Sequence, residues 1–397
     1  MEGARGQSTA GRPLPAWRGD ELAPGWKDAF RAVPRSAFLP DLMWPYDMAE
    51  RRAVPVVRTQ DPVVWRAFAD ADVPVVTQWD DGEHEGTAPG RLSTSSASMP
   101  SVVAAMLGDL QVADGNTVLE VGTGTGWNAA LLSHRLGDAH VTTVEVDPGV
   151  AATARGTLER AGFRPAVISG DGFAGHPARA PYDRIIATCG VREIPYAWVE
   201  QTTPGGVIVA PWGTRFGNAD AVVRLEVADG AASGRFTRRV EFMKMRAQRT
   251  AVRHGDRVPP EGTDLADPST TTLTEEDLLG DGSGTVPFVL GLRVPCCLQA
   301  AAEKRGDTRP VWFYGLADPS WAVVAFRDGQ PASPVWQFGP RRLWDEVESA
   351  VHWWRSQDHP TIDRFGLTVT PHGSHVWLDT ADRPVAEQCP GRTAPHP

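Results

Sequence analysis

The feature of the sequence that most constrains the fold is the segment Val118–Asn128, which reads VLEVGTGTGWN. Its first four residues are mostly apolar and predict a short buried strand, and three glycines at alternate positions then interrupt the pattern. Helix-forming residues follow from Ala129 onwards. A glycine-rich turn between a strand and a helix presents backbone N–H groups at the carboxyl edge of a sheet. The segment therefore predicts an α/β fold that holds a nucleotide-like ligand at that edge.

The residues after this turn alternate between short apolar segments and helical patterns. Helices are expected to His134, from about Val150 to Gly162, and from about Ala197 to Thr202. The expected strands are Val141–Asp147, Ala166–Ile168, Tyr182–Thr188, Val207–Trp212, Ala221–Val227 and Arg239–Met245. Because strands that alternate with helices at this spacing form a mostly parallel sheet between helices, we predict a Rossmann-like, doubly wound domain.

An acidic residue lies at the carboxyl end of each of the first three strands in this pattern. Glu120 precedes the first glycine by two positions, Glu145 ends the next strand, and Asp171 follows the third. A dinucleotide fingerprint would need glycine at position 127, where this chain has Trp127. A carboxylate at position 120 suits a cationic group, such as the ammonium of S-adenosylmethionine, better than a pyrophosphate.

The other two carboxylates match further parts of the same ligand. Glu145 lies where a carboxylate accepts both ribose hydroxyls, and Asp171 lies where one meets the adenine amino group. The combination predicts a methyltransferase fold that uses S-adenosylmethionine as its cofactor. The expected cofactor-binding residues are Glu120, Gly122, Thr123, Gly124, Thr125, Gly126, Asn128, Glu145, Val146, Asp171 and Gly172.

Composition divides the chain into four parts. Residues 1–24 are small, polar and rich in Pro and Gly, which predicts a flexible tail, and residues 25–249 form the domain with the glycine turn. Residues 250–285 are rich in Pro, Gly, Asp and Thr and predict a linker with one short helix. Residues 286–397 combine strand patterns with the amphipathic segment RRLWDEVESAVHWWRSQ and predict a small additional α+β domain. Its tryptophans fit either internal packing or a surface that docks a peptide substrate.

Bulk properties exclude several classes of protein. The 397 residues carry a net charge of −10, which argues against nucleic acid and anionic membranes as partners. No apolar run approaches the roughly 20 residues needed to span a bilayer, and the first residues lack a signal-peptide core. The four cysteines match neither a disulfide framework nor a metal spacing, so we expect reduced thiols, a cytoplasmic location and no metal.

Four segments resemble the protein-L-isoaspartate O-methyltransferase family over roughly residues 25–249. They read AFRAVPRSAFLP, VLEVGTGTGWNAALLS, GDGFAGHPARAPYDRIIATCGVREIP and TPGGVIVAPWG. The resemblance implies a doubly wound sheet with rearranged C-terminal strands. It also implies methyl transfer from S-adenosylmethionine to a peptide or protein that contains Asp or isoaspartate.

The same resemblance assigns the substrate site to Ser96-Ala97-Ser98-Met99-Pro100. On this match Ser98 occupies the position of the substrate-orienting hydroxyl, and Ser96 lies beside it. We expect residues 93–98 to be a hydroxyl-rich loop; from the residues alone, a solvated helix cap is an equal alternative.

The chain departs from the family pattern in TQWDDGEHEG, which precedes the serines, and in about 150 residues after the matched domain. These departures, with FMKMRAQ at residues 242–248, resemble a subset that acts in ribosomal peptide natural-product biosynthesis of the lanthipeptide and graspetide type. That resemblance implies methylation of an ordinary Asp side chain in a modified peptide. The ester then closes to an aspartimide, which water opens to isoaspartate. The alternatives are repair methylation of isoaspartate in damaged proteins and a non-catalytic peptide-binding scaffold.

Overall fold

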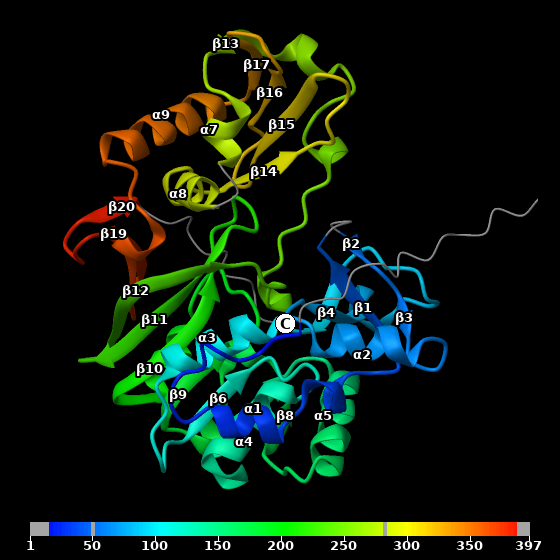
Figure 1. The fold of residues 1–397 in the computed structure, drawn as a ribbon. Coiled ribbons are helices and arrows are strands. Elements are labelled where there is room, and N and C mark those ends of the chain that lie inside the picture. The colour runs from blue at the N-terminus through cyan, green and yellow to red at the C-terminus, as the bar shows by residue number, and fades with distance from the viewer. Residues whose placement is uncertain (1–15, 49–51, 281–283, 387–397) are drawn as a thin grey trace, which may run out of the picture. The chain divides into compact units, whose positions relative to one another are not determined.

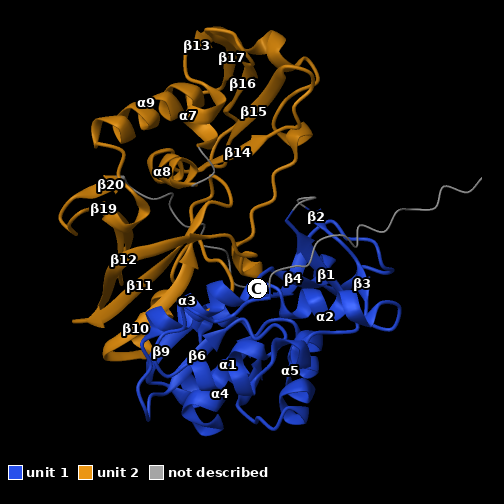
Figure 2. Cartoon of the chain, in the orientation of Figure 1, with its two compact units in different colours: residues 1–186 blue, residues 187–397 orange. Residues whose placement is uncertain are grey.

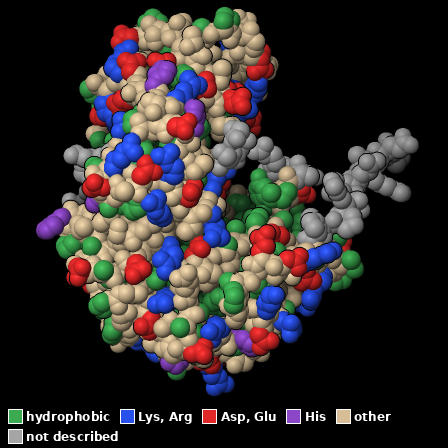
Figure 3. Space-filling view, turned by 60° about the vertical axis from the view of Figure 1, so that its left-hand side comes forward, with side chains coloured by type: hydrophobic (Ala, Val, Ile, Leu, Met, Phe, Trp, Pro, Cys, Tyr) green, Lys and Arg blue, Asp and Glu red, His purple; other side chains and the backbone are tan. Residues whose placement is uncertain are grey.

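The computed structural model describes residues 16–48, 52–280 and 284–386 of the chain. It contains two compact units, residues 1–186 and residues 187–397, which Figure 2 distinguishes by colour. Acidic and basic side chains are interspersed on the face of the molecule shown in Figure 3. Within the described ranges no helix is long and apolar enough to cross a membrane.

The first unit contains the parallel strands that the sequence predicts around the glycine turn (Figure 1). Their order is β9-β6-β7-β8, and β6 pairs in parallel with β7, as β7 does with β8. The elements are β6 (Val118–Val121), α4 (Trp127–Leu136), β7 (Val141–Glu145), α5 (Pro148–Arg160), β8 (Ala166–Ser169) and β9 (Tyr182–Ala187). All four residues of β6 are buried, so this strand lies in the core and brings the glycine turn to the edge of the sheet.

Local sequence signals fix where the helices of this unit begin. Pro148 is the first residue of α5, and the Asp147 side chain accepts hydrogen bonds from the N–H groups of Gly149 and Val150. Pro100 likewise begins α3 (Pro100–Leu110). Phe30 of α1 (Lys27–Ala32) contacts Trp127, the first residue of α4, with the ring centroids 5.7 Å apart.

A smaller antiparallel sheet completes the first unit. Its strands are β1 (Leu42–Asp47), β2 (Arg52–Ala53), β3 (Val56–Val57), β4 (Val75–Trp79) and β5 (Ser93–Ala97), with α2 (Pro62–Asp70) between β3 and β4. The order is β2-β1-β4-β5, and β3 pairs with β1. The prediction of a loop at residues 93–98 is therefore wrong for residues 93–97. Pairing with β4 satisfies the backbone, and Ala97 joins a small core with Met43 and Val75.

The second unit contains a row of antiparallel strands in the order β20-β19-β18-β12-β11-β10. They are β10 (Thr202–Trp212), β11 (Asp220–Ala228), β12 (Ala231–Val240), β18 (Phe365–Thr370), β19 (Gly373–Leu378) and β20 (Pro384–Ala386); α6 (Tyr196–Glu200) precedes β10. The strand predicted at Arg239–Met245 is wrong in its bounds. Asp229 and Gly230 have φ of 51° and 74°, which makes a tight turn and begins β12 eight residues earlier.

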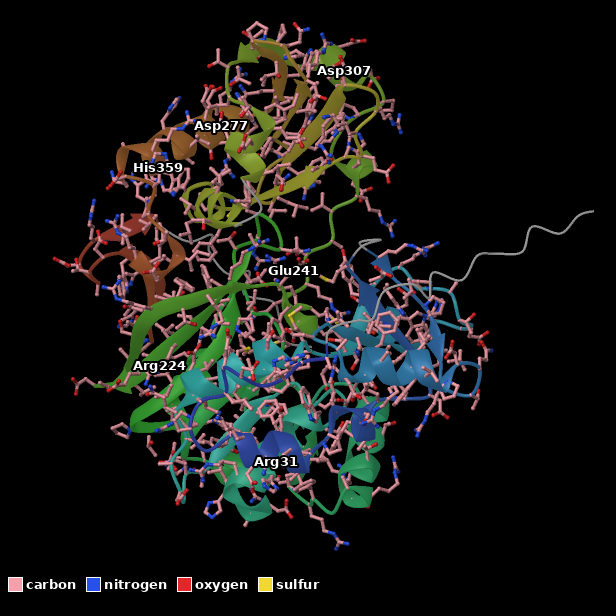
Figure 4. All side chains as sticks on the ribbon, viewed as in Figure 1. Arg31, Arg224, Glu241, Asp277, Asp307 and His359 are labelled. Carbon is pink, nitrogen blue, oxygen red and sulfur yellow. The ribbon has the colours of Figure 1, made fainter. Side chains whose placement is uncertain are left out.

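A separate five-stranded antiparallel sheet lies in the same unit, in the order β13-β17-β16-β15-β14. The elements are β13 (Asp267–Thr271), α7 (Glu275–Leu279), α8 (Thr285–Arg293), β14 (Cys297–Ala301), β15 (Thr308–Gly315), β16 (Trp321–Arg327), β17 (Ser333–Phe338) and α9 (Leu343–Ser356). Residues of α7, α8 and α9 share one apolar core with this sheet. Asp277 of α7, labelled in Figure 4, also forms an ion pair with Arg355 of α9.

The strand pairings concern two parts of the chain predicted from composition, the linker at residues 250–285 and the additional domain at residues 286–397. β13 and α7 lie within the expected linker, residues 250–285, and both pack with the second sheet. β18 pairs with β12, so residues after 364 continue the strands that precede residue 250. The domain limits given above stay a prediction.

The tryptophans and the cysteines test two further predictions from the sequence. Trp321 and Trp344 are buried in the second unit, as the packing interpretation requires for those two side chains. Cys189 and Cys297 are free thiols, whereas Cys296 is disulfide-bonded, so the expectation of four reduced cysteines is wrong. Within the described residues no group of three or more His, Cys, Asp or Glu side chains could hold a metal ion.

Candidate cofactor and substrate site

The glycine turn after β6 requires its glycines for two physical reasons. Gly122, Gly124 and Gly126 all have positive φ, at 100°, 53° and 87°, a region that other residues rarely adopt. A Cβ atom on Gly126 would lie 3.2 Å from Cγ of Leu158, and one on Gly124 would lie 3.4 Å from the carbonyl oxygen of Ser96. The third glycine therefore lets α5 approach the turn, and the second lets the end of β5 approach it.

Glu120 lies in β6 with no solvent exposure. Its Oε1 accepts a hydrogen bond of 2.7 Å from the side-chain amide of Asn128, on the second residue of α4. Its Oε2 has no hydrogen-bond partner among the residues that the structure describes. Burial raises the pKa of Glu120 to about 7; the Thr143 hydroxyl and the Asn128 amide oppose the rise, and the charge of Glu145 adds to it.

Glu145 ends β7 and faces the same turn. Its Oε2 accepts from the backbone N–H of Gly124 at 3.0 Å, and its Oε1 accepts from the N–H of Asp147 at 3.1 Å. Its carbonyl oxygen accepts from the N–H of Gly170 at 2.9 Å, which ties the end of β8 to the end of β7. The structure thus brings Glu145 to the backbone of the second glycine.

The other predicted cofactor residues lie along this edge. Asp171 is exposed after β8 and its Oδ1 accepts from the N–H of Phe173 at 2.9 Å, while Gly172 is buried. Val146 is 40 % exposed beside Glu145, where an apolar side chain is free to contact a flat ring. Thr123 is buried and its hydroxyl lies 2.6 Å from that of Thr143, so it packs beneath the turn; Thr125 is half-buried within the turn.

These groups fit S-adenosylmethionine. A fully buried carboxylate oxygen without a partner suits a cationic group, and the Glu145 carboxylate at the next strand end suits a vicinal diol. Val146 and Asp171 are exposed beyond Glu145, where they could contact the adenine ring and its amino group. Glu120, Asn128, Glu145, Val146 and Asp171 are the side chains that would hold it.

The serines predicted to orient the substrate lie at the end of β5. Ser96 pairs with Val76 of β4, and Ser98 is half-buried between β5 and Pro100. The register of β4 and β5 shifts on both sides of Gln78, and such bulges redirect neighbouring side chains. Because the Ser96 carbonyl lies against Gly124, the end of β5 and the glycine turn are adjacent within one unit.

Three residues of this region were not predicted from the sequence. Gln78 donates its side-chain amide to Oδ2 of Asp147 at 3.3 Å and accepts from the Thr94 hydroxyl at 2.8 Å, which links β4 and β5 to the start of α5. The Asp147-Pro148 pair is itself a helix-start signal that could have revealed Asp147. Buried Arg35 holds the end of β5 from the chain segment before β1. Nothing in the local sequence marks Gln78 or Arg35 for these roles.

The acidic segment before the serines is held in place by its own contacts. Asp80 accepts from the backbone N–H groups of Arg91 and Leu92 at 3.0 and 2.8 Å. These two bonds, the Arg91 bond foremost, hold the pKa of Asp80 below its usual value. The indole N–H of Trp44 donates to the carbonyl oxygen of Thr87 at 2.8 Å. The segment therefore closes as a loop beside β5.

The chain is similar to known protein-L-isoaspartate O-methyltransferases. A family model described as protein-L-isoaspartate(D-aspartate) O-methyltransferase (PCMT) matches residues 77–249. The protein-L-isoaspartate O-methyltransferase of Thermococcus onnurineus (strain NA1) is 35 % identical over 181 residues, which cover 44 % of this chain and 80 % of the relative. That of Pyrococcus abyssi (strain GE5 / Orsay) is 45 % identical over 120 residues, 30 % of this chain and 55 % of the relative. A solved protein-L-isoaspartate O-methyltransferase aligns at 23 % identity and a TM-score of 0.49, over 91 % of this chain and 96 % of that one.

The fold and the glycine turn are those of an S-adenosylmethionine-dependent methyltransferase, and S-adenosylmethionine is the cofactor. The chain belongs to the protein-L-isoaspartate O-methyltransferase family. The family model ends at residue 249, so the second sheet of the C-terminal half lies outside the matched region.

Proposed function

We propose that this chain methylates the α-carboxylate of an isoaspartyl residue in a protein or peptide. The observation that carries the proposal is the contact between the end of β5 and the glycine turn, where the Ser96 carbonyl lies 3.4 Å from the Cβ position of Gly124. A carboxylate oriented at Ser96 and Ser98 would then be next to a ligand held at the turn.

S-adenosylmethionine, when bound, supplies an electrophilic methyl group carried on a cationic sulfur. Glu120 and Asn128 would neutralise and orient its cationic end, and Glu145 would accept its ribose hydroxyls. Val146, Asp171 and Gly172 would contact the adenine, while Gly122 to Gly126 would provide close backbone approach. The turn and its neighbouring strand ends thus bind and orient the donor.

The acceptor needs no general base, because a carboxyl group of this kind has a pKa near 4 and is ionised at neutral pH. The task of the site is to align the carboxylate oxygen and to remove water from two opposite charges. Neutral donors such as the Ser98 and Ser96 hydroxyls orient the anion without holding its ground state too tightly. Arg35, the nearby cation, already donates to three backbone carbonyls and leaves this role to the serines.

The methyl ester is a better electrophile than the carboxylate. Attack by the following backbone nitrogen expels methanol and closes an aspartimide, and water opens the ring largely to isoaspartate. These steps need no further group of the protein. The proposed partner is accordingly a peptide or protein that contains isoaspartate. The proposed location is the cytoplasm, as predicted from the sequence.

The second candidate is methylation of an ordinary Asp side chain in a modified ribosomal peptide. The observation that favours it is the sheet β13–β17 with α7 to α9, an ordered module beyond the residues that the family model matches. A module of this size provides additional surface for a defined peptide. A non-catalytic peptide-binding scaffold would share that module but would not need intact Glu120, Glu145 and Asp171.

One assay separates these functions. The protein is incubated with S-adenosylmethionine and either a peptide with one isoaspartate or the same peptide with Asp, and ester formation is followed by mass spectrometry. Turnover on the isoaspartyl peptide is the expected result. Turnover on Asp alone, in a constrained peptide, would replace the proposal with the second candidate. Absence of S-adenosylhomocysteine binding by calorimetry would instead favour the scaffold.

A further inference from the structure

Arg35 is a buried cation whose two terminal nitrogens donate to backbone carbonyls of other segments. Its side chain is 5 % exposed. Nη1 donates to the carbonyl oxygen of Ala71 at 3.2 Å, and Nη2 donates to those of Val73 at 2.9 Å and Ala97 at 2.8 Å. One guanidinium therefore ties together three points of the chain.

Two of the three acceptors precede β4 in the chain, and the third ends β5. Ala71 caps the end of α2 and Val73 lies just before β4, whereas Ala97 is the last residue of β5. Ala97 immediately precedes Ser98. The shortest of the three hydrogen bonds thus ends one residue from the hydroxyl assigned to the substrate carboxylate.

Arg35 is also linked to the cofactor turn through Trp127, the first residue of α4. Its Cζ lies 5.9 Å from the centre of the Trp127 ring, within reach of a cation–π contact. The indole N–H of Trp127 donates to the carbonyl oxygen of Val33 at 3.0 Å, which fixes the backbone two residues before Arg35. The segment Val33–Arg35 therefore connects the helix after the glycine turn to the end of β5.

We infer that Arg35 is a positioning residue, which holds Ser98 at a fixed place relative to the glycine turn and so aligns the substrate carboxylate with the methyl donor. The inference rests on the proposed function for the role of Ser98. The hydrogen bonds that carry it are independent of which peptide is the substrate.

The chemistry of the arginine side chain explains why lysine would not serve. A planar guanidinium presents several N–H groups at fixed angles and can bond three carbonyls at once, whereas an ammonium is a point donor on a flexible chain. Burial lowers the pKa of Arg35 to about 10, with Asp72 and then Asp70 opposing the change, so the group is cationic at neutral pH. Arg35→Lys therefore keeps the charge and removes the fork.

The test compares Arg35→Lys with Arg58→Lys. Arg58 is an exposed control on the same unit. Its Cζ lies 4.8 Å from the Trp65 ring centre, and its Nη1 lies 3.8 Å from Oδ1 of Asp41. For Arg35→Lys we expect kcat/KM for the peptide to fall about 10- to 100-fold, since small misplacements of reacting groups have effects of this size. The Kd for S-adenosylhomocysteine should stay within about twofold, and amide hydrogen exchange should rise in residues 97–99 but not in 118–130.

Trp127→Phe provides a second variant, which keeps an aromatic ring but removes the indole donor to Val33 together with part of the ring volume. It should change peptide kcat/KM and exchange at 97–99 in the same direction, by a smaller factor. Equal losses of cofactor affinity and peptide turnover, or unchanged exchange at 97–99 in both variants, would overturn the inference. If the wild type methylates neither Asp nor isoaspartyl peptides, the proposed function fails, and the exchange measurement still decides the positioning of this segment.

Discussion

The side-chain amide of Asn128 donates to Oε1 of Glu120 across 2.7 Å, and it is a neutral partner for a carboxylate that solvent does not reach. A neutral donor compensates only part of the cost of burying a charge. Near neutral pH the Glu120 side chain is therefore close to the balance between its protonated and ionised forms. A cation bound at the glycine turn would favour the ionised form. Ligand charge and pH are thereby coupled at this residue.

The first prediction concerns pH and the stability of the cofactor-free protein. Burial raises the pKa of Glu120 from 4.5 to about 7, so between these values the folded protein binds a proton that the unfolded chain releases. The contribution of Glu120 to the free energy of unfolding is therefore fully present below about pH 4.5 and decreases by ~3 kcal/mol as the pH rises through 7. Chemical denaturation from pH 5 to 8 measures this slope.

Glu120→Gln is the control for that prediction, because the amide does not titrate. The difference in unfolding free energy between wild type and Glu120→Gln should depend on pH, and saturating S-adenosylmethionine should reduce this dependence. Parallel pH profiles for the two proteins would show that Glu120 is ionised throughout this range.

The second prediction concerns the Glu145 carboxylate. Glu145→Ala removes the acceptor that faces the Gly124 N–H and that would accept the ribose hydroxyls. We expect the Kd for S-adenosylhomocysteine to rise about 10- to 100-fold, since hydrogen bonds to a charged group contribute about 1.5–3 kcal/mol each. Calorimetry measures the change. Glu159→Ala, on the exposed side of α5, removes the same charge away from the turn and should leave the Kd unchanged.

The parallel strands around the glycine turn could be predicted because their signals are local. β6 is mostly apolar and the glycines follow it, β7 ends in Glu145, and Asp171 follows the end of β8 by two positions. Each of these strands is recognised by residues within a few positions of its end. The edge of the sheet that positions the cofactor turn follows directly from them.

The β5 strand and Arg35 could not be predicted in this way, because their determinants are distant in the chain. Residues 93–96 are Ser and Thr, and they form a strand because β4 pairs with them and Ala97 is buried. The carbonyls that Arg35 bonds are 36, 38 and 62 positions away. β12 is an intermediate case, since its polar residues weaken the strand pattern while the Asp229-Gly230 turn before it is a recognisable hairpin signal.

The third prediction concerns the substrate serines. Ser98→Ala removes the hydroxyl proposed to orient the substrate carboxylate, so we expect kcat/KM for the peptide to fall about 10- to 100-fold at unchanged cofactor affinity. Ser101→Ala is the matched control on the other side of Pro100, since the bond of Ser101 to Asp72 uses the backbone N–H and survives the change. Initial rates at saturating S-adenosylmethionine provide the measurement. Full turnover by Ser98→Ala would remove this residue from the site.

The last prediction concerns the strand pairing between β12 and β18. Ala232–Arg235 of β12 pair with Gly366–Val369 of β18, and the hydroxyls of Ser233 and Thr368 lie 2.8 Å apart. A chain ended after Arg249, where the family model stops, would expose this edge of β12, and exposed strand edges pair between molecules. We therefore expect the shortened protein to aggregate, measured by light scattering after size-exclusion chromatography.

Gly366→Ala tests the same pairing in the full chain and avoids the loss of the whole module. A Cβ atom at Gly366 would lie 2.1 Å from Cζ2 of Trp377, a ring that also lies 5.1 Å from the Arg235 guanidinium. The Cβ atom would also lie 2.5 Å from the carbonyl oxygen of Gly234 in β12, so both Trp377 and that backbone would have to move. The free energy of unfolding should therefore fall by about 1–3 kcal/mol, as overpacking of a well-packed site does. Gly373→Ala, at the first residue of β19, has open space at its Cβ position but a φ of 128°, so its cost is backbone strain alone. A stable, monomeric chain ended at residue 249, together with a neutral Gly366→Ala, would show that residues after 364 are dispensable for the strands before residue 250.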